Sequence, residues 1–130
     1  MDYQNFEKML NAMTLQAKAF LKEMGMFYPF GTAVNKKGEI TPIGAFVEDE
    51  NLSSNILIQM LEKRINEGIA DNTFIMGAIG IDVNINLDHN KKSNAVEIRT
   101  IQKGNEKWGY VYLPYNIENK EVLFGEFKTF

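Results

Sequence analysis

The sequence predicts an α+β domain in which a helix, a β-hairpin, a second helix and a four-stranded antiparallel meander follow one another. Three observations lead to this fold class. Two segments repeat apolar residues at the three- and four-residue spacing of a helix. The stretch after the second helix alternates apolar and polar residues, as strands with one buried face do. Turns that contain Gly and Asn divide this stretch, which favours antiparallel neighbours.

The composition indicates one globular domain spanning residues 1–130. A hydrophobic content of 45% with 24% charged residues is typical of a packed protein and excludes a disordered chain. The net charge of -3, with both signs mixed along the chain, argues against nucleic acid as a partner. The lack of cysteine excludes disulfides and thiolate metal sites. Without a leader-like start or a long apolar run, we expect a cytoplasmic protein that does not contact membranes.

The first half of the chain predicts two helices and a hairpin. An amphipathic pattern over Asp2 to Met24 precedes Gly25, which is placed to end the helix in a left-handed turn. Two β-prone runs, Phe27 to Val34 and Glu39 to Val47, flank a polar loop and form the hairpin. Pro29 and Pro42 each remove a backbone donor, so these strands are expected at a sheet edge or bent there.

The second helix is predicted to begin after an N-cap at Ser53 or Ser54 and to end near Gly68. Its apolar stripe consists of Ile58, Leu61, Ile65 and Ile69. The charged run Glu62-Lys63-Arg64 is interpreted as a solvated face of this helix.

The meander begins with a long strand over Phe74 to Leu87. Pairing it with the strand Asn94 to Gln102 so that opposite charges meet sets Asp82 opposite Arg99 and Asn84 opposite Glu97. The two-residue turn Gly104-Asn105 then fixes the next pairings: Ile98 with Val111, Val96 with Leu113, Arg99 with Tyr110 and Glu97 with Tyr112. A final strand, Glu121 to Phe130, is expected to set Leu123 against Leu113, Phe124 against Tyr112 and Glu126 against Tyr110.

These registers predict a meander with two different faces. One face is apolar, and both helices are expected to cover it; it consists of Ile79, Ile81, Val83, Ile85, Val96, Ile98, Val111, Leu113, Leu123 and Phe127. The other face combines aromatic and charged residues, which are typical of contact surfaces. We call its main residues the candidate binding face: Asp82, Glu97, Arg99, Trp108, Tyr110, Tyr112 and Phe124.

The order of elements resembles nuclear transport factor 2-like and cystatin-like folds, in which a curved sheet wraps a helix. That resemblance implies a domain able to dimerise through the back of its sheet, but no activity, because those folds serve enzymes, ligand binders and dimerisation modules. A profilin-like arrangement is an open alternative. The segment Phe27-Tyr28-Pro29-Phe30-Gly31 also resembles part of an uncharacterised family of small bacterial proteins. The strings Asn94-Ala95-Val96-Glu97-Ile98 and Leu113-Pro114-Tyr115 resemble that family's closing strands.

The sequence contains no recognisable catalytic, cofactor or metal motif. The single histidine, His89, lies in a polar loop, and Gly77-Ala78-Ile79-Gly80 lacks the further glycine and following helix of a dinucleotide site. In the predicted registers Asp82, Glu97 and Arg99 lie beside two tyrosines. A desolvated carboxylate there could act as a general base, whereas a cross-strand ion-pair ladder is the simpler interpretation.

Two functional hypotheses follow from these patterns. The first is a non-catalytic interaction module of a bacterium, for instance in an immunity-type or accessory role, whose candidate binding face contacts another protein or a second copy as a homodimer. The second is a small-molecule binder or enzyme with a cavity between the first helix and the sheet, lined by Phe6, Met13, Phe30, Met76 and Ile79.

Overall fold

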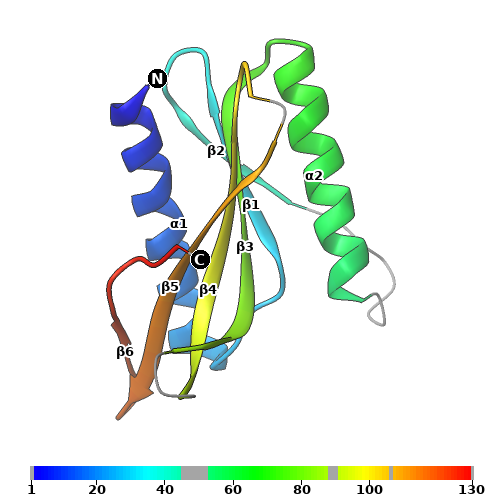
Figure 1. Ribbon diagram of the computed structural model, residues 1–130. Coiled ribbons are helices and arrows are strands. Elements are labelled where there is room, and N and C mark those ends of the chain that lie inside the picture. Colours follow the sequence, from blue (N-terminus) through cyan, green and yellow to red (C-terminus); the bar gives the residue numbers. More distant parts are fainter. Residues whose placement is uncertain (1, 45–52, 88–90, 106, 130) are drawn as a thin grey trace.

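The chain folds into a six-stranded antiparallel sheet with two helices (Figure 1). The computed structural model describes residues 2–44, 53–87, 91–105 and 107–129, so the predicted loop position of His89 lies outside the described residues. The strand order is β2-β1-β3-β4-β5-β6. The elements are α1 (Tyr3–Met24), β1 (Phe30–Asn35), β2 (Ile40–Ile43), α2 (Ser54–Ala70), β3 (Phe74–Asn86), β4 (Lys92–Gln102), β5 (Gly109–Glu118) and β6 (Glu121–Phe124). Neither of these helices is long and apolar enough to cross a bilayer.

The two helices lie on opposite faces of the sheet, which corrects the expectation that both cover one face. Figure 1 shows the strands passing between α1 and α2. The even-numbered Met76 and Ala78 of β3 belong to a core with α1, whereas the odd-numbered Ile79 and Ile81 belong to a core with α2. Because successive strand residues point to opposite faces, β3 is buried on both sides over this half of its length.

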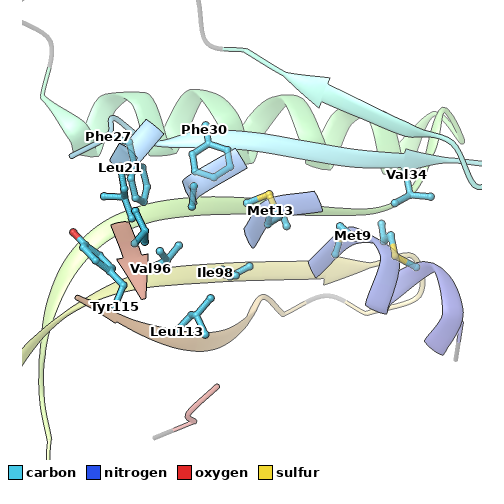
Figure 2. Packing of buried hydrophobic residues seen from close by; sticks show 14 residues of the cluster. Met9, Met13, Leu21, Phe27, Phe30, Val34, Val96, Ile98, Leu113 and Tyr115 are labelled. Atoms are coloured by element: carbon cyan, nitrogen blue, oxygen red, sulfur yellow. The ribbon is translucent and has the colours of Figure 1, made fainter. Parts of the chain in front are cut away.

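The core on the α1 side is built from helix residues that meet β1, β3, β4 and β5 (Figure 2). Its buried members are Met9, Met13, Ala17, Leu21, Phe27, Phe30, Val34, Met76, Ala78, Val96, Ile98, Leu113, Tyr115 and Val122. The rings of Phe20, Phe27 and Phe30 pack on one another, with centroids 5.3 to 6.3 Å apart. Met9 and Met13 are fully buried and fill this core, a common use of the flexible methionine side chain.

The core on the α2 side is smaller and joins the helix to the hairpin and to β3 and β4. Its buried members are Ala33, Ile43, Ile58, Leu61, Ile65, Phe74, Ile79, Ile81 and Ile101. Small residues in the strands let the helix approach closely, because a Cβ on Gly77 would collide with Ile65. Gly68 was expected to end the helix but lies inside it against the ring of Phe74, and α2 continues to Ala70.

The other predicted ends of the helices are confirmed. Asp2 caps α1 by accepting a hydrogen bond from the backbone N–H of Asn5, and Gly25 follows the helix with a φ of 72°. Ser53 caps α2 by accepting from the N–H of Ile56. Each cap accepts a hydrogen bond from an N–H group in the first turn of the helix, which has no carbonyl partner within the helix.

The hairpin β1–β2 is also confirmed, with Val34 opposite Ile40 and Gly31 opposite Ile43. The first strand begins at Phe30 rather than Phe27, and positions 45–47 of the second predicted strand lie outside the described residues. Its loop closes through Asn35, whose side chain accepts from the N–H groups of Lys37 and Glu39. Strand β2 is an edge strand, where Pro42 is tolerated because a missing donor there interrupts no second ladder.

The pairing of β3 with β4 differs from the predicted register by three residues. Asp82 lies opposite Val96 rather than Arg99, and Arg99 lies opposite Ile79. The shift exchanges the two faces of β4, so that Val96 and Ile98 join the α1-side core. In this register Val96 and Ile98 join Met76 and Ala78 in the core beneath α1. The burial of these apolar side chains outweighs the exposed charge pairs that the prediction used.

The pairing of β4 with β5 is confirmed at each predicted position, including Glu97 with Tyr112 and Arg99 with Tyr110. The predicted pairing of β5 with β6 is wrong. Strand β5 continues to Glu118, and the positive φ angles of Asn119 and Lys120 make a tight turn into β6. Phe124 therefore lies opposite Tyr115 instead of Tyr112, and Leu123 and Phe127, expected in the core, are each 47% exposed.

Candidate functional site

The structure divides the candidate binding face between the two sides of the sheet. Glu97, Arg99, Tyr110 and Tyr112 alternate with α1-side core residues on β4 and β5, so they lie on the side that carries α2. Trp108 packs partly buried against the α2-side core. Asp82 and Phe124 lie on the α1 side, where Asp82 meets Tyr115 and Phe124 packs against the core. We call the residues on the α2 side, namely Glu97, Arg99, Trp108, Tyr110 and Tyr112, the α2-side surface.

An ion-pair cluster lies at the centre of the α2-side surface. The Nε of Arg99 lies 2.6 Å from a carboxylate oxygen of Glu97, and its Nη1 lies 3.0 Å from a carboxylate oxygen of Glu62 in α2. The side chains are 24%, 12% and 31% exposed for Arg99, Glu97 and Glu62. The guanidinium carbon also lies 5.3 Å from the ring centroid of Tyr110, within cation–π range. One guanidinium thus binds two carboxylates and one ring.

A groove borders this cluster where β3 continues beyond the contacts with α2. It has a volume of about 480 Å³ and is lined by Val83, Asn84, Ile85, Asn86, Glu97 and Tyr112. Burial raises the pKa of Tyr112, and the negative charge of Glu97 and a hydrogen bond to it raise this pKa further. The hydroxyl of Tyr112 therefore stays protonated at neutral pH and acts as a hydrogen-bond donor to Glu97.

Asp82 has a different partner from the one predicted. The hydroxyl of Tyr115 donates a hydrogen bond of 2.6 Å to its carboxylate from β5, across the intervening strand β4. Tyr115 is buried, and burial together with this carboxylate raises the pKa of its hydroxyl well above the usual range. A second hollow of about 260 Å³ lies beside this residue, lined by Ser93, Pro114, Tyr115, Asn116, Leu123, Phe124 and Gly125.

The substitution Tyr115→Phe is expected to lower the free energy of unfolding by about 1.5 kcal/mol near neutral pH, because a hydrogen bond to a carboxylate is lost. The raised pKa gives a second signature. Tyrosines of the unfolded chain ionise near pH ~10, so stability is complete below that pH and falls above it while folded Tyr115 stays protonated. Urea unfolding at about pH 8 and about pH 11 should show a smaller alkaline loss for Tyr115→Phe than for the wild type. Equal losses would contradict this account of Tyr115.

The structure shows which of the predicted chemical groups meet. Glu97 and Arg99 form an ion pair, but Asp82 is separated from both by the sheet. Residues that were predicted to line a cavity are divided in the same way: Phe6, Met13, Phe30 and Met76 belong to the α1-side core, and Ile79 belongs to the α2-side core. Within residues 2–44, 53–87, 91–105 and 107–129, three or more His, Cys, Asp or Glu residues do not converge in a metal-binding group.

Two residues of these clusters were not identified from the sequence. Glu62 was assigned to a solvated helix face, but it borders the buried stripe of Leu61 and Ile65 and reaches Arg99. Its position one residue after a core leucine was the available signal, since such positions flank a helix–sheet contact. Tyr115 gave no comparable signal, because its contact with Asp82 depends on the register of two strand pairs. Lys63 and Arg64 are exposed, as expected.

Comparisons with known proteins give no match: no family model, no curated protein and no solved structure is significantly similar to this chain.

Proposed function

We propose that this chain is a non-catalytic protein-interaction module that binds a protein partner through its α2-side surface. The observation that supports this most strongly is the exposure of Tyr110. Its side chain is 48% exposed although it stacks on an arginine that is held by two carboxylates. Tyr, Trp and Arg are the residues that most often contribute large binding energies at protein interfaces.

The rigidity of the cluster supports binding over a purely structural role. Arg99 is fixed by Glu97 from its own strand and by Glu62 from α2, so its guanidinium is already ordered before any partner arrives. Ordering a flexible arginine on binding costs free energy, and a pre-ordered one avoids that cost. Tyr110 lies on this fixed platform, and Trp108 is held by its contact with the α2-side core.

The charges of the surface suggest the chemistry of the partner. Glu62 and Glu97 contribute two carboxylates against the single guanidinium of Arg99, and the adjoining groove adds the apolar side chains of Val83 and Ile85. A partner segment with a basic group beside an apolar side chain would complement both features. The proposal therefore concerns a partner with such a segment.

Site-specific photo-crosslinking tests this function. A benzoyl-phenylalanine placed at position 110 in cells of the native host is expected to form an adduct with a defined protein, whereas the same group at position 28 is not. Tyr28 is a suitable control because it is 65% exposed and lies outside the α2-side surface. The captured protein, once purified, should bind the Tyr110→Ala variant at least about tenfold more weakly than the wild type.

The matched variant Tyr28→Ala should bind that purified protein as the wild type does. Equal adducts at positions 110 and 28, absence of any adduct at position 110, or unchanged affinity for Tyr110→Ala would each contradict the proposal. An adduct with a second copy of the chain would identify the partner as the protein itself.

A further inference from the structure

Strand β3 has an open edge beyond the end of its neighbour β1. The ladder between β1 and β3 ends where Phe30 lies opposite Gly80, and Pro29 precedes it. On its other side β3 stays paired with β4 as far as Asn86. Among the residues that the structure describes, no strand pairs with positions 81–86 on the β1 side.

The backbone polarity of this edge follows from the hydrogen bonds at both ends of β3. The N–H of Leu87 donates to Lys91, and the carbonyl of Ile75 accepts from Lys103, so odd-numbered residues direct their backbone groups toward β4. The ladder between these points has no register shift. Because the direction alternates along a strand, Asp82, Asn84 and Asn86 direct their N–H and C=O groups to the open side.

We propose that this edge binds the same edge of a second copy, antiparallel, around a two-fold axis at Asn84. The two Asn84 residues would then face each other, and Asp82 would lie opposite the partner's Asn86. Each of these three positions would exchange a pair of backbone hydrogen bonds with its opposite number. The two six-stranded sheets would become one continuous sheet, as in other cases of strand addition.

The side chains favour a second copy of the chain as the occupant of this edge. In this register Asp82, whose Oδ1 accepts from Tyr115 of its own chain, lies opposite the amide of the partner's Asn86. The half-buried Val83 lies opposite the partner's Ile85 on the other face of the sheet. Polar residues thus face polar ones and apolar residues face apolar ones, which a two-fold interface requires because it uses the same patch twice. A register that placed Asp82 against its own copy would set like charges together.

Other edges of the sheet carry features that discourage such pairing. Strand β2 has four residues and contains Pro42, and β6 has four residues and is followed by Gly125. The open part of β3 contains neither proline nor lysine. Natural proteins commonly use short strands, proline and lysine to block edges. The lack of these features at positions 81–86 favours the use of this edge for pairing.

Sedimentation analysis over a range of protein concentrations tests the inference. We expect a monomer–dimer equilibrium for the wild type. The substitution Asn84→Pro removes a donor that faces away from β4, so it should spare the fold and weaken the dimer by at least about tenfold. The variant Asn84→Thr keeps the donor in a β-prone residue and should dimerise like the wild type.

A second pair of variants separates a specific register from loss of folding. Asn86→Asp would place a carboxylate opposite the partner's Asp82 and weaken the dimer, whereas Asn86→Lys at the same position would strengthen it. Salt should reduce both effects. Circular dichroism would verify that all four variants remain folded.

Three results would overturn the inference: a wild type that stays monomeric at all concentrations, a dimer that is insensitive to Asn84→Pro, or effects of equal sign for the two Asn86 variants. Loss of the dimer in Tyr110→Ala with a normal dimer in Asn84→Pro would place the contact on the α2-side surface. That outcome would overturn the edge dimer while supporting the proposed function, so the two failures are distinguishable.

Discussion

Replacing Arg99 by methionine is expected to lower the free energy of unfolding by about 3 kcal/mol, because it leaves the buried carboxylate of Glu97 without its counter-charge. Glu97 is 9% exposed as a whole residue, and its 2.6 Å contact with Arg99 replaces the hydration that stabilises the carboxylate in the unfolded chain. Methionine keeps much of the length and apolar stem of arginine, so the change mainly removes charge and hydrogen bonding. Urea unfolding at neutral pH measures the effect.

Two further variants identify the cause of this loss. Adding Glu97→Gln to Arg99→Met should recover more than half of the stability, since the orphaned charge is then removed as well. Glu62→Gln alone should cost less than about 1 kcal/mol, because Glu62 is more exposed and Arg99 retains its second carboxylate. A double variant as unstable as Arg99→Met would show that the loss arises from packing rather than from charge.

The substitution Met13→Ala is expected to cost about 3 kcal/mol, because it opens a cavity in the α1-side core. Met13 is fully buried between α1 and the sheet, near Phe30 and the small residue Gly80 (Figure 2). Most buried residues of this core belong to helices or strands, so we expect little collapse into the cavity. Thermal and urea unfolding would both report the loss.

Combining variants tests whether the two cores are separate. Met13→Ala and Ile65→Val lie on opposite faces of the sheet, so their effects should add within about 0.5 kcal/mol. Met13→Ala and Phe30→Leu share one core, and their effects should differ from the sum. Strong coupling between Met13 and Ile65 would contradict the placement of the helices on opposite faces.

The features that the sequence predicts correctly depend on local signals. The cap at Ser53, the turn at Gly25 and the hairpin loop at Asn35 each act within a few residues. The register of β4 with β5 is the one predicted from the Gly104-Asn105 turn, with the ladder described from Thr100 opposite Gly109 onward. The closing pair of that turn includes Glu106, which lies outside the described residues. These features can therefore be predicted without knowing which parts of the chain pack against them.

The placement of the helices could not be predicted because the apolar pattern of β3 fits two arrangements, burial of one face or of both faces. The stretch Met76 to Ala78 predicts a dry second face at the start of β3, yet a strand with one buried face also fits most of the pattern. Choosing the β3–β4 register from charge pairs then set Val96 and Ile98 on the wrong side. Exposed ion pairs contribute too little to decide a register when apolar burial on both faces is possible.

The candidate site was predicted in part for the same reason. The β4–β5 register was predicted correctly, so the prediction placed together the four residues Glu97, Arg99, Tyr110 and Tyr112. Asp82 and Phe124 lie elsewhere because their placement required the β3–β4 and β5–β6 registers. The contribution of Glu62 comes from α2 and depends on the side of the sheet that this helix covers, which local patterns do not determine.

The measurement that tests this account most directly is the set of cross-strand nuclear Overhauser effects between β3 and β4. Even-numbered residues of β3 face β4 in closely spaced pairs without mutual hydrogen bonds, so their Hα atoms lie near those of their partners. We expect Hα–Hα effects between Asp82 and Val96 and between Asn84 and Asn94. Effects that connect Asp82 with Arg99 would contradict the account, because both sides of the sheet would then be exchanged along β4.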